Sequence, residues 1–244
     1  MTDAAPVALP DAYTNTFEQL LNDVATATRD DVPLVPFWPL RGARYAGELL
    51  VIGRSVNGWI EDWTAGQLRD PATRRSAVDV MRADAEPMDR DRMAWVKDLW
   101  GATDGYNTRL SAFWRVLVDL LGDRVDPTRA SRLVWTNLYK VSPAAGWNPG
   151  ADLQRAQRAG AVDLLRVELE AYRPRRVLAL TGDWIVPFEA GLELDLAWRD
   201  GLVVATTARS GTPWVIARHP MKKPHEPFVA EVRDAFRALG EPLA

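Results

Sequence analysis

Four short, almost wholly apolar runs, separated by helix-length segments, constrain the fold of this chain more than any other feature. They fall within residues 48–53, 132–141, 175–182 and 212–220. Strands that are apolar at nearly every position are typical of parallel sheets, because helices cover both faces of such sheets. Their alternation with helices therefore predicts an α/β fold, a three-layer α/β/α sandwich with a central, mostly parallel four-stranded sheet.

The segments between these strands carry helical periodicity. In TFEQLLNDVATAT the apolar residues Phe17, Leu20, Leu21 and Val24 fall on one helical face. A second helix is predicted from Asn107 as its cap to Gly122, with Leu110 on its apolar face, and further helices over 151–173 and 226–240. GLVVATTARSG, residues 201–211, adds a strand beside 212–220. We expect one domain, residues 1–244, with a loose N-terminal arm (1–13) and a helical insertion at about 60–106.

Composition narrows the classes of function that are open to the chain. It has no cysteine and two histidines, which excludes disulfides and thiolate metal sites and disfavours a histidine-rich metal centre. We therefore expect no metal ion and no cofactor. Without an 18-residue apolar run or a signal-peptide pattern, a cytoplasmic monomer that does not enter a membrane is expected. The net charge of -3 means that any nucleic-acid binding must use a local basic patch.

Polar turns follow the apolar runs, and open α/β sheets bind their ligands at the carboxyl ends of the strands. The first turn, GRSVNGW, presents Gly53, Ser55, Asn57 and Trp59. The second run carries Asn137, whose side-chain amide combines a donor and an acceptor that match the edge of a nucleobase. The glycine keeps the backbone open, and the tryptophan offers a ring on which a base can stack. These residues predict a pocket for a base.

The turn after the last apolar run is basic. It contains Arg218, His219, Lys222 and Lys223, and no acidic residue lies between positions 218 and 225. A histidine in such a place can stabilise an anion that develops on a departing base. The neighbouring cations suit the phosphates of DNA.

Together these motifs resemble the uracil-DNA glycosylase superfamily over about 170 residues, from Gly47 to Phe236. "WTNLYKVSP" with "WNP" downstream is similar to the strand that reads the uracil edge, which implies that role for Asn137. "VIARHP" is similar to the closing strand and its histidine–proline loop, which implies that His219 stabilises the leaving base. "GRSVNG" stands where the family places its catalytic Asp, Asn or Glu, and Ser55 occupies that position.

The resemblance implies hydrolysis of the N-glycosidic bond of a flipped uracil or other damaged base in DNA. Asn137 and Gly53 would hold the base with Trp59, while Ser55 or Asn57 would position the attacking water. Arg218, Lys222 and Lys223 would contact DNA. Because serine is not a general base, the enzyme is expected to be slow, since such a base contributes typically 10²–10⁴-fold.

Two other functions remain open on the sequence. The first is a protein that kept this fold and binds a base, a nucleotide or DNA without catalysis, for which Ser55 is the main support. The second is a serine hydrolase, because Ser55, Asp183 and His219 follow the chain order of the α/β-hydrolases. Asn57 stands where the nucleophile elbow of that class has glycine, which weakens the second.

Overall fold

The computed structural model describes residues 8–56, 62–86, 90–122, 125–146, 148–196, 203–208 and 210–243. The contacts between residues divide the chain into two compact units, and each unit consists of three segments of the sequence. The first unit comprises residues 1–39, 53–87 and 136–173, and the second comprises 40–52, 88–135 and 174–244. The expectation of one domain stays a prediction.

A mixed, mostly parallel sheet forms the centre of the second unit. Its strand order is β2-β5-β3-β7-β9-β8, so six strands are present among the described residues where the sequence predicted four. β3 pairs with β7 and β7 with β9 in parallel, with Ile52 opposite Ala179 and Ala179 opposite Ile216. β2 and β8 are added antiparallel to β5 and β9 at the edges. The bounds are β2 Leu40–Arg41, β3 Leu49–Ser55, β5 Leu133–Tyr139, β7 Val177–Ala179, β8 Val203–Thr207 and β9 Pro213–Ala217.

The apolar runs form strands whose side chains are mostly buried. Leu49, Leu50, Val51 and Ile52 are each 0% exposed, as are the residues of β7. β3 continues through Gly53 to Ser55, so Gly53 lies within a strand and the predicted turn begins later than expected. β3 and β5 run from the second unit into the first, and their last residues belong to the first unit.

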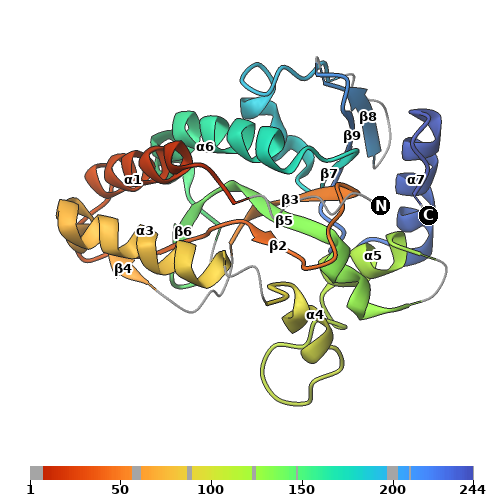
Figure 1. Ribbon diagram of the computed structural model, residues 1–244, viewed down its shortest axis with the longest axis horizontal. Coiled ribbons are helices and arrows are strands. Elements are labelled where there is room, and N and C mark those ends of the chain that lie inside the picture. The colour runs from red at the N-terminus through yellow and green to blue at the C-terminus, as the bar shows by residue number, and fades with distance from the viewer. Residues whose placement is uncertain are drawn as a thin grey trace. The chain divides into compact units, whose positions relative to one another are not determined.

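Helices complete the second unit. α7 (His225–Ala238) packs on β8 and β9, and its N-terminal end meets α5 (Ala112–Leu120), as Figure 1 shows. The other helical elements of this unit are α4 (Ala94–Asp98), η1 (Pro127–Arg132) and η2 (Gly182–Phe188). Pro227 lies in the first turn of α7, as predicted, where its missing N–H is not needed.

The predicted start of α5 is wrong. The helix begins after Ser111, and Asn107 instead accepts hydrogen bonds at Oδ1 from the N–H groups of Gly101 and Arg109. Leu110, expected on the apolar face, is 77% exposed because it lies in the loop before the helix. Asparagine bonds to backbone groups in loops as readily as at helix caps, so its position alone did not distinguish the two.

The first unit combines helices with a three-stranded antiparallel sheet of order β4-β1-β6. α1 runs along α6 and also packs on α3, as Figure 1 shows in red, green and orange. Phe17, Leu20, Leu21 and Val24 are buried together, as their helical spacing predicted. A Cβ on Gly160 would lie 3.1 Å from Leu20 Cβ, so glycine allows α1 and α6 to approach closely. The bounds are α1 Asp11–Thr26, α2 Ala65–Arg69, α3 Pro71–Ala85, α6 Ala151–Tyr172, β1 Pro33–Pro36, β4 Trp63–Thr64 and β6 Val141–Pro143.

Two boundaries differ from the sequence predictions. α1 begins at Asp11, and Leu9 and Tyr13 are buried, so the end of the expected loose arm (1–13) packs against the protein. The expected insertion at about 60–106 is helical in α2, α3 and α4, but α2 and α3 pack on α1 as part of the first unit. Of the helices described, none is both long and apolar enough to traverse a membrane.

Candidate functional site

Asn137 is a buried polar residue of the first unit with an unsatisfied donor. Its side chain is 1% exposed, and its Nδ2 has no hydrogen-bond partner within the described chain. A buried donor left without a partner costs about 1–3 kcal/mol. Because side chains alternate along a strand, Asn137 and Tyr139 lie on one face of β5 and Thr136 on the other. The fold therefore buries the Nδ2 group of Asn137 without providing it with an acceptor.

A fully buried polar network fixes the opposite face of the same strand. Lys140 Nζ donates to Thr136 Oγ1 and to Glu168 Oε1, both at 2.7 Å. The hydroxyl of Tyr13 donates to the same carboxylate oxygen at 2.6 Å. Burial lowers the pKa of Lys140, and the carboxylate of Glu168 opposes that shift. The network ties β5 to α1 and α6, and so determines where the backbone of Asn137 lies.

A pair of side-chain hydrogen bonds fixes the backbone at Val141, just after β5. Gln157 of α6 accepts from the Val141 N–H at 2.9 Å and donates to the Val141 carbonyl at 2.9 Å, although Gln157 is fully buried. An amide side chain thus takes the place of a neighbouring strand. Together with the lysine network, this pairing makes the segment that carries Asn137 rigid.

Ser55 ends β3, a strand that is a direct neighbour of β5 in the sheet. Its Oγ donates to Asn148 Oδ1 at 3.0 Å, and both residues belong to the first unit. Sequence reasoning missed this role of Asn148, although the "WNP" motif that contains it was the available signal. Asn57 and Trp59, the other predicted residues of this turn, lie outside the described residues, as does Trp147.

His219 follows β9 in the second unit and is held in a defined orientation. Its Nδ1 accepts from the backbone N–H of Met221 at 3.3 Å, and its ring is stacked on Phe113 with centroids 6.3 Å apart. With Nδ1 as acceptor, the proton of a neutral imidazole is on Nε2. This tautomer is the one that donates a hydrogen bond from Nε2 to an anion.

The basic residues predicted beside His219 form a tight turn. The N–H of Lys223 donates to the Pro220 carbonyl at 3.1 Å, and Lys222 has a left-handed backbone with φ 62. Arg218 and Lys222 are exposed, and Lys223 is half-buried. The structure thus places Gly53, Ser55 and Asn137 in the first unit, and Arg218, His219, Lys222 and Lys223 in the second.

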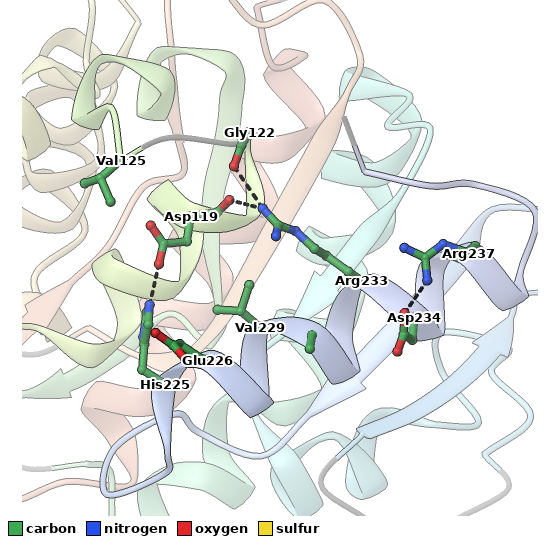
Figure 2. Close-up of a pocket in the computed structure, with 10 residues that line it drawn as sticks. Asp119, Gly122, Val125, His225, Glu226, Val229, Arg233, Asp234 and Arg237 are labelled. Atoms are coloured by element: carbon green, nitrogen blue, oxygen red, sulfur yellow. Dashed lines mark hydrogen bonds and ion pairs between the residues drawn. The ribbon is translucent and has the colours of Figure 1, made fainter.

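A cavity of about 490 Å³ lies between α5 and α7 in the second unit. Figure 2 shows that His225 points at the carboxylate of Asp119, with which it pairs. In the same view, Arg233 reaches the last turn of α5 and donates to the carbonyls of Asp119 at 2.7 Å and Gly122 at 2.9 Å. Because His225 pairs with Asp119 and Arg233 is bonded to backbone carbonyls, we interpret the cavity as part of the packing between α5 and α7.

The described residues contain no group of three or more His, Cys, Asp or Glu side chains that could hold a metal ion. The chain matches no model of a known protein family, and it likewise matches none of the curated proteins. The case for a function therefore depends on the residues themselves.

Proposed function

We propose that this protein is a slow glycosylase of the uracil-DNA glycosylase type, with that fold's three-layer architecture, and that it acts on uracil or another damaged base in DNA. The observation that carries the proposal is the buried, unpartnered Nδ2 of Asn137 on a rigid strand. A flipped base would supply the missing acceptor, which accounts for a donor that the fold itself leaves unsatisfied.

In the proposed reaction, the oxygen of a water molecule forms a bond to the anomeric carbon of the sugar as the bond from that carbon to the base nitrogen breaks. The electron pair of the broken bond leaves with the base, and His219 donates a hydrogen bond from Nε2 to the anion that results. Asn137 holds the edge of the base. The water loses its proton to solvent, because no carboxylate stands at position 55 to take it.

Ser55 and Asn148 support a role in placing the water. A hydroxyl that donates to Asn148 Oδ1 still offers its own lone pairs, and the amide Nδ2 of Asn148 offers donors. Such a pair orients water but does not activate it. The expected rate is lower by the typical contribution of a general base, roughly 10²–10⁴-fold.

The experiment measures release of uracil from labelled single-stranded DNA and from a duplex that contains a mismatched uracil. Release by the wild type, lost in Asn137→Ala and in His219→Ala, supports the enzyme. Arg155→Ala, which removes an exposed ion pair on α6, serves as the matched control and should keep wild-type activity. Release that survives both site substitutions would overturn the proposal.

A non-catalytic base-binding or DNA-binding protein is the second candidate, favoured by the serine at position 55. It predicts binding of uracil that Asn137→Ala abolishes, without any release of base from DNA. A serine hydrolase has less support, because the single proton of the Ser55 hydroxyl is donated to Asn148. A catalytic serine donates that proton to its base. Labelling of Ser55 by a fluorophosphonate would restore this candidate.

A further inference from the structure

A chain of aromatic rings leads from His219 to the surface of the second unit. Phe113 stacks on His219, and Trp114 and Trp135 lie next along the chain, with ring centroids 5.0 Å and 6.3 Å from Phe113. Trp95 follows at 4.9 Å from Trp114, and Tyr106 ends the series at 6.3 Å from Trp95. We call these six residues the aromatic cluster. Trp114 is buried, whereas Tyr106 is 53% exposed.

The exposed end of the aromatic cluster is held on a rigid loop. Asn107 Oδ1 accepts from two backbone N–H groups, and its Nδ2 donates to the Ala102 carbonyl at 2.8 Å. Thr108, fully buried, donates from Oγ1 to the Val96 carbonyl at 2.7 Å. Tyr106 and Leu110 flank these two residues and are 53% and 77% exposed. Two large apolar side chains are thus presented to solvent on a braced backbone, which lowers the entropy cost of binding.

Exposed cations stand near both ends of the aromatic cluster in the sequence, although the whole chain carries a formal charge of -3. Arg109 precedes Leu110 on the loop, and Arg218 and Lys222 lie on either side of His219 in the sequence; all three are exposed. Asp104 is the acidic residue of the braced loop, residues 99–111. Aromatic surface combined with flanking cations is the combination that binds single-stranded nucleic acid, because bases stack on rings while phosphates attract the cations.

We propose that the exposed end of the aromatic cluster, formed by Tyr106 with Leu110 nearby on the same loop, binds unpaired nucleic-acid strand, with one base stacked on Tyr106. Arg109, Arg218 and Lys222 contact the phosphates. This inference deepens the proposed function, because it assigns the protein a preference for single-stranded over fully paired substrate.

The test compares binding of two fluorescent oligomers of about 12 nucleotides, a length within the usual range for such sites. One is oligothymidylate, and the other has the same phosphates with abasic sugars throughout. Wild type should bind the thymidylate more tightly. Tyr106→Ala should weaken thymidylate binding about 5- to 150-fold, the range found when a stacking residue is truncated. It should leave binding of the abasic oligomer unchanged, and Tyr106→Trp should keep wild-type affinity.

Two further variants separate stacking from charge. Arg109→Ala should weaken binding of both oligomers and reduce the dependence of log K on log salt by about one phosphate contact. Val186→Ala, an apolar side chain that is 45% exposed elsewhere on the second unit, is the matched control and should bind as the wild type does. Unchanged thermal midpoints would show that Tyr106→Ala is folded, as expected for an exposed side chain.

Equal loss of affinity for both oligomers in Tyr106→Ala, or no preference of the wild type for bases, overturns the proposal. Self-association that disappears in Tyr106→Ala, without base-dependent binding, would identify the surface as a protein interface and would also overturn it. Because neither oligomer contains uracil and no release is measured, these outcomes are independent of the Asn137 and His219 activity test.

Discussion

Lys140 Nζ lies 2.7 Å from Glu168 Oε1, and both side chains are completely buried. Tyr13 donates a further hydrogen bond to Glu168 and Thr136 accepts one from Lys140, while the other carboxylate oxygen of Glu168 has no partner within the described residues. Such a pair adds little net stability over an apolar core, but removing one partner leaves a buried charge uncompensated. The pair also anchors the strand that carries Asn137, so its integrity bears on both stability and the candidate site.

Breaking this pair should destabilise the protein strongly. We expect Lys140→Met to lower the free energy of unfolding by about 3–5 kcal/mol, because Glu168 is left buried without its cation. Urea denaturation, followed by tryptophan fluorescence, measures the change.

The double variant Lys140→Met/Glu168→Met should be more stable than Lys140→Met alone, since it removes the stranded charge. Arg155→Ala breaks an exposed pair and should cost no more than about 1 kcal/mol. A double variant less stable than either single one would show that the pair itself is strongly stabilising, contrary to this account.

The free energy of unfolding should fall at high pH, because the hydroxyl of Tyr13 ionises more readily in the unfolded chain than in the folded protein. Burial, followed by the nearby charge of Glu168, raises the pKa of Tyr13 well above its ordinary value of 10.0. The unfolded chain therefore loses this proton above about pH 10, while the folded protein keeps it. The contribution of Tyr13 is fully present below pH 10 and is lost as pH rises further, by about 1.4 kcal/mol per pH unit.

Tyr13→Phe removes the titrating hydroxyl while keeping the ring. Its unfolding free energy, measured in urea between pH 9 and about pH 11, should decline less steeply than that of the wild type. Parallel declines in the two proteins would mean that Tyr13 ionises equally in both states. Tyr45 and Tyr139 are also buried, and burial raises the pKa of each, so both contribute the same slope to the two proteins.

Arg233 should contribute more to the stability of the protein than Arg237, the other arginine of α7. Its guanidinium donates to two carbonyls at the end of α5, where carbonyls no longer accept the regular i+4 hydrogen bonds of a helix. We expect Arg233→Ala to cost about 2–3 kcal/mol, since hydrogen bonds to charged groups contribute about 1.5–3 kcal/mol. Thermal unfolding compares it with Arg237→Ala, whose side chain is 67% exposed and pairs with Asp234. Equal effects of the two variants would contradict a capping role.

Asn137→Ala should separate function from stability. Removal of an unpartnered buried donor relieves about 1–3 kcal/mol, which offsets the small cavity that alanine leaves. We expect the free energy of unfolding to change by less than about 1 kcal/mol, while uracil binding falls by tenfold or more. Leu138→Ala, at the next fully buried position, should cost about 2–5 kcal/mol. An equally large loss in Asn137→Ala would show that the amide has a structural role.

Local patterns predicted the elements better than the partners of individual side chains. The apolar runs and the helical face of Phe17, Leu20 and Val24 are where the sequence placed them. The role predicted for Asn107 was wrong, because an asparagine before a helical pattern can equally well cap the helix or bond to backbone groups of the preceding loop. The wrong expectation that Leu110 is buried on a helical face followed from the same error. Lys140 gave no sign of burial, because its partner Glu168 is distant in sequence and charge alone predicts a surface position.

The sequence by itself determined the four apolar strands, most of the helices that separate them, and the polar residues at or near the ends of those strands, because these depend on periodicity and on turn chemistry over a few residues. Only the tertiary structure decided that Ser55 bonds Asn148, that Asp119 meets His225, and that the amide of Asn137 is buried without a partner. Each of these depends on segments that folding brings together from distant positions in the sequence, and a local sequence pattern cannot predict such contacts.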